Sequence, residues 1–197
     1  MANSHHNDGT VGALQSVLDA MIDPINQLFF HSRMMRSWGH SLGMERNMEW
    51  IVKMRRTGVL AVALRKHGAG PISREARDLV IGHDPASILK SDADQTRWFL
   101  EVVKRALEQC SQEADRKVLE EIATAERADL GRLEGWINGP EAQEQPRGAK
   151  FLLPKPGSAE IAFGAINAVL PDMTSSVSQV FHHSLIFKGM SNDALAE

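Results

Sequence analysis

The chain has 197 residues, 43% of them hydrophobic, so it is long enough for one folded domain and too apolar to be disordered throughout. Its net charge of −3 provides no basic field for nucleic acid, and its one cysteine, Cys110, excludes an intramolecular disulfide. No apolar run is long enough to span a bilayer, and the polar N-terminus lacks a signal-sequence pattern, so we expect a cytoplasmic protein that does not bind membranes.

Two helices are predicted in the first part of the chain. Apolar residues recur at three- and four-residue steps over residues 11–38, and a similar period runs from about residue 45 to residue 67. Pro24 lies inside the first pattern, where we expect it to kink the helix or to remove a hydrogen bond. Gly39 and Gly43 mark the turn between these helices, and the segment 67–71 ends the second.

Two more helices are predicted after a long connection over residues 68–84. Asp84 and Pro85 form an N-cap and first helical position, so a third helix begins there and ends near residue 109. A fourth helix is expected over about 111–138, where Asn138-Gly139-Pro140 stops it. A pair of helices, a long crossover and a second pair predict an all-α, ferritin-like four-helix bundle.

The bundle is expected to occupy residues 1–139. Residues 140–156 are rich in glycine, proline and charge, which predicts a linker, and residues 157–197 form a C-terminal extension. Within that extension, residues 173–188 predict a short amphipathic fifth helix. The apolar residues of the extension need a covering surface.

One segment, residues 25–39, has the sequence INQLFFHSRMMRSWG. It resembles the first helix of bacterioferritin, the haem-containing iron-storage ferritin, in which INQ and an aromatic residue precede FLHARM and then WG. The similarity extends more weakly over residues 11–138 and does not cover residues 140–197. The resemblance implies a 24-subunit shell of two-fold dimers, one haem b between the subunits of each dimer, and a di-iron ferroxidase centre inside each bundle.

The ligands of that di-iron centre are mostly absent. The family has a Glu on helices one and three and Glu-x-x-His on helices two and four, and the corresponding residues here are Met21, Thr96, Lys53, Arg56, Glu126 and Asp129. Iron needs carboxylate ligands to neutralise its charge, whereas a lysine and an arginine repel Fe²⁺. We therefore expect no di-iron centre and no ferroxidase activity.

Two interpretations of this substitution are open. In the first interpretation, Lys53 and Arg56 pair with Glu126 and Asp129 across the second and fourth helices, because a buried charge needs a partner. Alternatively, these four residues lie on solvated faces. Glu126 and Asp129 are retained as candidate residual metal ligands.

The same alignment places Met54 at the family's axial haem ligand. A neutral thioether suits a low-spin haem iron in an apolar slot. The residues that correspond to the slot lining are Ile22, Ile25, Asn26 and Phe29, on one face of the first helix, and Ile51 on the second. Asn47 stands where the family often has an aromatic residue. Met54 as an ordinary core methionine is the alternative.

These resemblances imply a haem-binding, ferroxidase-inactive subunit of an iron-storage shell, in which haem transfers electrons for iron release. The shell is a homo-oligomer or contains an active bacterioferritin as partner. The alternative is a metal-free, ferritin-like structural or interaction protein whose C-terminal extension docks a partner. A third interpretation is a ferroxidase with ligands at other positions. His31 is predicted to be a hydrogen-bonded core histidine.

Overall fold

The computed structural model describes residues 8–71 and 79–145. Within these ranges the chain is all-helical and has no strand, which confirms the predicted helical bundle. The elements are α1 (Asp8–Ser37), α2 (Gly43–Lys66), α3 (Pro85–Gln109), α4 (Glu113–Ile137) and a short 3-10 helix, η1 (Pro140–Gln143). The predicted bounds agree with these to within a few residues.

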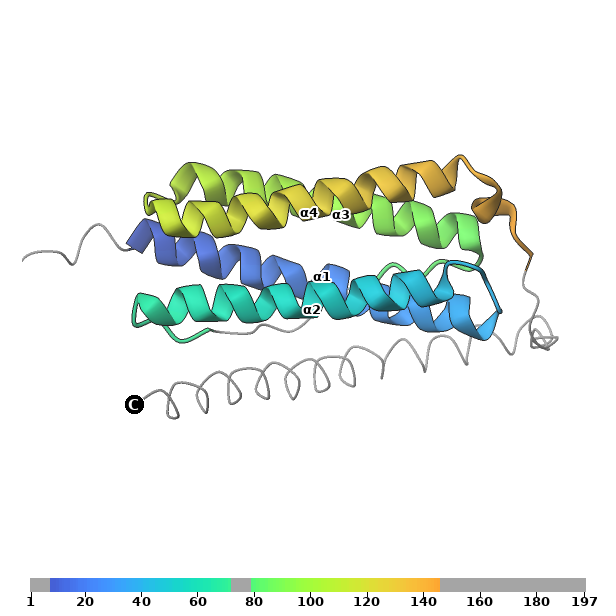
Figure 1. Cartoon of the computed structure of the whole chain (residues 1–197), viewed down its shortest axis with the longest axis horizontal. Coiled ribbons are helices and arrows are strands. Elements are labelled where there is room, and N and C mark those ends of the chain that lie inside the picture. Colours follow the sequence, from blue (N-terminus) through green and yellow to red (C-terminus); the bar gives the residue numbers. More distant parts are fainter. Residues whose placement is uncertain (1–7, 72–78, 146–197) are drawn as a thin grey trace, which may run out of the picture.

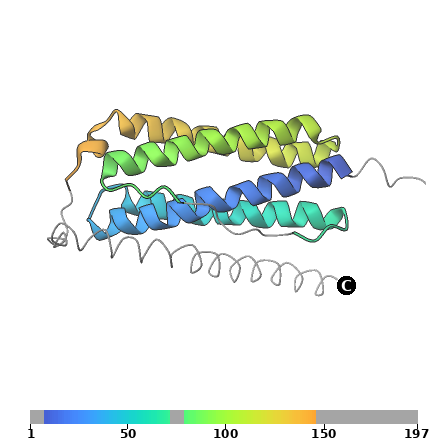
Figure 2. The same ribbon diagram turned by 180° about the vertical axis from the view of Figure 1, so that it is seen from behind.

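The four long helices lie side by side, and α2 and α3 run in the same direction (Figures 1 and 2). The contacts at one end of the bundle fix this order. The end of α2 meets the start of α4, where His67 Nε2 lies 2.7 Å from Asp115 Oδ2. The start of α1 meets the end of α3, where Thr10 Oγ1 lies 3.2 Å from Ser111 Oγ. The connection between α2 and α3 therefore has to return along the length of the bundle.

Local sequence signals act as predicted at α3. Asp84 Oδ1 accepts a hydrogen bond from the Ser87 backbone N–H at 2.7 Å, and Ser87 Oγ accepts one from the Asp84 N–H at 3.0 Å. This reciprocal cap satisfies backbone donors that a helix start leaves unpaired. In α1 the helix continues through the buried Pro24 and ends only at Ser37, so the proline removes one backbone donor without ending the helix.

The apolar core is divided into two clusters along the bundle axis. The larger cluster includes Leu14, Leu18, Leu64, Phe99 and Leu119, from all four helices. The smaller cluster lies nearer the turn between α1 and α2 and consists of Met35, Leu42, Ile88, Leu89, Ala93 and Leu133. On α2, α3 and α4 the buried residues between these two sets are polar or charged, apart from Gly43, so a polar layer separates the two clusters.

The first residues of the predicted linker are ordered. Residues 140–143 form η1, and the His40 ring Nε2–H donates to the Glu141 carbonyl oxygen at 2.9 Å. The Ser41 backbone N–H donates to Glu144 Oε2 at 3.2 Å. The described chain therefore ends beside the turn between α1 and α2. The predicted extension over 157–197 and its fifth helix lie outside the described residues.

None of the helices described above is both long enough and apolar enough to cross a membrane.

Replacing Phe99, which is completely buried in the larger cluster, tests this packing. We expect Phe99→Ala to lower the free energy of unfolding by about 3–5 kcal/mol, because a cavity replaces the ring. Val62→Ala, at a position that is about half exposed, is the control and should change it by less than about 0.5 kcal/mol. Urea denaturation followed by circular dichroism measures both, and equal effects would contradict the core assignment.

Candidate functional site

The inward face of α2 carries four charged side chains. Arg46, Glu49, Lys53 and Arg56 follow one another at steps of three and four residues, which places them on one side of a helix. Arg46 and Lys53 are only 1% and 2% exposed. Charges buried to this extent need partners, because desolvation costs several kcal/mol per ion.

Helix α4 provides carboxylates opposite α2. Lys53 Nζ donates to Glu126 Oε2 and lies 3.3 Å from Asp129 Oδ2. Arg56 Nη1 donates to Glu126 Oε1 at 2.6 Å. The predicted pairing across α2 and α4 is thus present, and the alternative of solvated faces is wrong for Lys53, Glu126 and Asp129. Arg56 contacts Glu126 rather than Asp129, and it is only partly buried.

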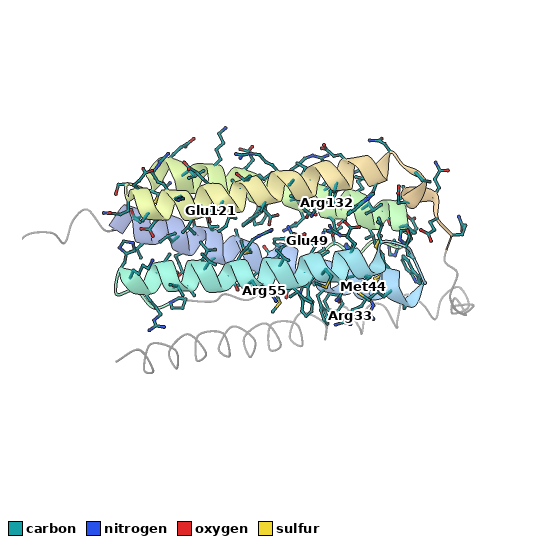
Figure 3. All side chains as sticks on the ribbon, in the orientation of Figure 1. Arg33, Met44, Glu49, Arg55, Glu121 and Arg132 are labelled. Atoms are coloured by element: carbon teal, nitrogen blue, oxygen red, sulfur yellow. The ribbon has the colours of Figure 1, made fainter. Side chains whose placement is uncertain are left out.

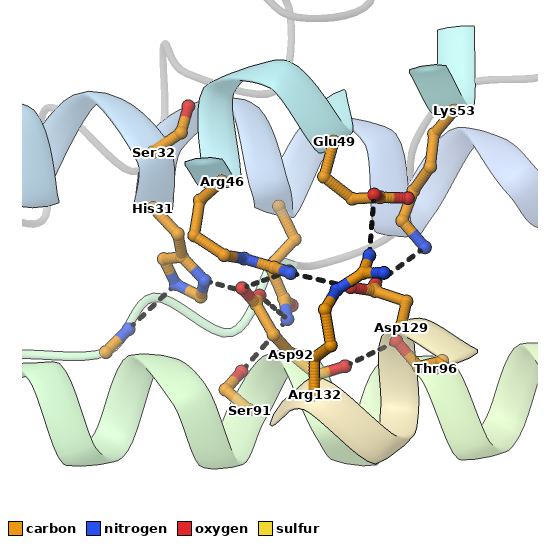
Figure 4. A network of polar contacts seen from close by, with 12 residues as sticks. His31, Ser32, Arg46, Glu49, Lys53, Ser91, Asp92, Thr96, Asp129 and Arg132 are labelled. Carbon is orange, nitrogen blue, oxygen red and sulfur yellow. Dashed lines mark hydrogen bonds and ion pairs between the residues drawn. The ribbon is translucent and has the colours of Figure 1, made fainter. Parts of the chain in front are cut away.

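The network continues through Arg46 to α3 and α1 (Figure 4). Arg46 donates to Asp129 Oδ1 at 2.9 Å and to Asp92 Oδ2 at 3.0 Å. The other oxygen of Asp92 lies 2.7 Å from His31 Nδ1. Because the Gly82 backbone N–H donates to His31 Nε2 at 3.1 Å, the ring proton lies on Nδ1 and is donated to Asp92. His31 is therefore the hydrogen-bonded core histidine that was predicted.

Arg132 closes the network at its outer edge, between α2 and α4 (Figure 3). Its Nη2 atom donates to Glu49 Oε2 at 2.9 Å and to Asp129 Oδ1 at 3.1 Å. We call the connected set of four cations and four carboxylates the interior ion cluster. Its members are Arg46, Lys53, Arg56, Arg132, Glu49, Asp92, Glu126 and Asp129. The four positive charges of this cluster balance its four negative charges.

The cluster holds its buried aspartates in the ionised form. Burial alone would raise the pKa of Asp92, but its interactions with His31 and Arg46 outweigh burial and hold that pKa well below its usual range. Burial also opposes ionisation of Asp129, and Arg46, Lys53 and Arg132 together lower its pKa. Burial acts to lower the pKa of Arg46, yet Asp92 and Asp129 raise it above the usual value.

The positions that correspond to di-iron ligands do not form a metal site among the described residues. Glu126 and Asp129, the candidate residual ligands, are each bound to cations of the cluster. Met21 is buried in the larger apolar cluster, and Thr96 Oγ1 donates to the Asp92 carbonyl oxygen of its own helix at 2.8 Å. Over residues 8–71 and 79–145, no group of three or more His, Cys, Asp or Glu side chains is arranged to hold a metal ion.

The haem-ligand candidate Met54 lies in a different environment from its neighbour Lys53. Met54 is 6% exposed and belongs to the larger apolar cluster, together with Ile25 of α1. Of the other candidate slot residues, Ile22 and Asn26 are buried, whereas Phe29 and Ile51 are half-buried. Phe29 also packs against Trp50 of α2, with ring centroids 5.1 Å apart. These contacts define an apolar seam between α1 and α2.

Sequence analysis missed half of the interior ion cluster: Arg46, Glu49, Asp92 and Arg132. The spacing of charges on α2 was a usable signal, since residues 46, 49, 53 and 56 repeat at helical steps. No comparable signal exists for Asp92 or Arg132, because their partners lie on other helices and only tertiary packing brings them together.

A comparison of the chain with models of known protein families gives no match, and a comparison with curated proteins gives none either.

Removing the buried ammonium group tests the interior ion cluster. We expect Lys53→Met to lower the free energy of unfolding by about 3–5 kcal/mol, because it leaves Glu126 with one cation fewer in a buried site. Lys90→Met is the matched control, since Lys90 pairs with Asp94 on an exposed surface and should contribute less than about 1 kcal/mol. Chemical denaturation at pH 7 distinguishes the two, and a small effect of Lys53→Met would place Lys53 outside the interior.

Acidification should weaken the fold through Asp92. Its pKa in the folded chain lies below the unfolded value of about 3.9, so its contribution is complete above that value and is lost as pH falls toward the folded pKa. We expect Asp92→Asn to be less stable at pH 7 and to lose less further stability on acidification. Urea denaturation between about pH 7 and 2.5 measures this slope. Asp94→Asn is the comparison, because Lys90 also lowers the pKa of Asp94 but solvent screens this exposed group, so this variant should reduce the slope less than Asp92→Asn does.

Proposed function

We propose that this chain is a bacterioferritin-like, haem-binding subunit of an iron-storage shell and that its bundle interior oxidises no iron. The observation that carries the proposal is the contrast between two consecutive residues of α2. Lys53 meets Glu126 and Asp129 in the interior, whereas Met54 lies in the apolar cluster with Ile25 of α1. The bacterioferritin alignment requires this division, because it assigns the first position to the iron site and the second to haem.

The interior supports a subunit without ferroxidase activity. A ferrous ion needs several carboxylate oxygens to neutralise its charge. Here Glu126 and Asp129 already bind the ammonium group of Lys53, and Arg46 and Arg56 hold their other oxygens. Fe²⁺ would have to enter beside three cations in a medium of low dielectric constant, where their repulsion is strong.

The donor set of the seam between α1 and α2 fits a haem b group held by two methionines. Met54 provides a soft, neutral sulfur, and its unbranched side chain has the rotational freedom to turn toward a ligand. Ile22, Ile25, Phe29 and Ile51 provide apolar walls that exclude water. Met54 of each of two copies would hold the haem iron, and the bound group would supply one-electron transfer.

One polar side chain lies beside the apolar residues of the seam. Asn47 lies two helical turns before Met54 on the same face of α2 and is 8% exposed. Its side-chain oxygen has no hydrogen-bond partner within the described chain. A buried amide oxygen without a partner is costly, but haem b carries no hydrogen-bond donor that could satisfy it, so this atom does not argue for haem.

The visible spectrum tests the haem site directly. We expect a Soret band from the full chain purified from haem-replete cells, and we expect Met54→Ala to lose it because the axial sulfur is removed. Met48→Ala is the matched control, since Met48 lies on the exposed side of α2 and should leave the band unchanged. Equal loss in both variants would show that the band does not report ligation by Met54.

Absence of a Soret band from the parent chain would overturn the haem proposal. The second candidate function, a metal-free ferritin-like scaffold, then stands, and the burial of Met54 within the larger apolar cluster favours it. Oxidation of Fe²⁺ by the purified chain faster than in buffer would contradict both candidates and require iron ligands at other positions.

A further inference from the structure

The outward side of α2 carries an exposed apolar stripe. Five large apolar side chains are strongly exposed in the described ranges, and four of them are Met44, Met48, Val59 and Val62 of α2, at 57%, 52%, 48% and 49%. With the half-buried Val52 they follow one another at helical steps, interrupted by the exposed Arg55. We call Met44, Met48, Val52, Val59 and Val62 the α2 stripe.

The α2 stripe lies on the side of the helix opposite the interior ion cluster. In Figure 3, Glu49 lies between α2 and α4, whereas Met44 and Arg55 lie along the outer edge of α2. The stripe extends from residue 44 to residue 62, which is about 27 Å at the rise of an α-helix. An apolar strip of this length on a surface, even with one arginine in it, marks a contact with another segment or molecule.

We propose that the occupant of the α2 stripe is this chain's own segment 173–188. Glu141 and Glu144 bond to His40 and Ser41, so the described chain ends next to the start of α2. The described chain therefore ends near one end of the stripe. Residues 173–188 have the pattern of an amphipathic helix, whose length of about 24 Å would nearly match the stripe.

The covalent connection favours this segment over a second copy of the chain. Residues 146–172 can span about 90 Å when extended, so segment 173–188 can reach either end of the stripe in either direction. A tethered segment is present at the stripe at an effective concentration on the order of millimolar. This exceeds the concentration of a second copy of the chain in a dilute solution, so the tethered segment has the advantage in binding the stripe. Apolar residues in the extension and on α2 would thereby be removed from water together.

Docking of the segment excludes other partners from the same surface. A chain whose segment 173–188 covers the α2 stripe cannot offer that stripe to a second subunit. The inference rests on residues other than Met54, which lies in the seam with α1 and is not part of the stripe.

Hydrogen exchange of the full chain tests the docking. We expect the backbone amides of residues 173–188 to be protected in the parent chain and to exchange at least about tenfold faster in Met48→Asp/Val59→Asp. Val80→Asp is the matched control, because Val80 is also an exposed valine but lies outside α2. Since Met48 and Val59 are exposed, both variants should keep the parent's helical circular dichroism and its exchange within α3 and α4.

Three results would overturn the proposal. The first is the absence of protection over residues 173–188 in the parent chain. The second is protection that the double substitution leaves unchanged, which would place the segment elsewhere. The third comes from native mass spectrometry of the same samples. If the double substitution dissociates a dimer without changing exchange over 173–188, a second copy covers the stripe.

Discussion

The structure depends on the burial of the Lys53 ammonium group between α2 and α4. That position is possible only because Glu126 and Asp129 face it, and those carboxylates are tied in turn to Arg46, Arg56 and Arg132. The requirement to pair every buried charge fixes the relative position of α2 and α4 along their axes. A shift by one helical turn would leave several charges unpaired in the interior, each at a cost of several kcal/mol.

The interior ion cluster also explains the division of the core. Apolar residues occupy the bundle above and below it, and the charged layer separates the two clusters on α2, α3 and α4. A buried ion network is not the most stabilising way to fill this space, because apolar side chains of similar volume often serve as well. We interpret its value as specificity, since it selects one order and one register of the helices.

Helix α2 has a different role on each of its sides. Lys53 and its neighbours face α4, Met54 faces the seam with α1, and Met44 and Val59 face outward. The first side supports an interior without iron chemistry, the second supports the proposed haem site, and the third supports the proposed docking of the chain's own extension. The segment 173–188 and a second subunit compete for the outward side, which connects the assembly of the proposed shell to the extension.

The sequence by itself determined the helices, the cap at Asp84 and the all-α class, because these follow from periodicity and local chemistry. The pairing of Lys53 with α4 was one of two interpretations that the sequence left open. The sequence also showed Lys53 and Arg56 at positions where the bacterioferritin resemblance implies iron ligands. Only the tertiary structure decided that Arg46 joins Asp92 to Asp129 and that Arg132 closes the cluster, since these pairs are distant in sequence. It alone decided which apolar residues of α2 are buried and which form the stripe, because helical periodicity does not specify which neighbours cover a face.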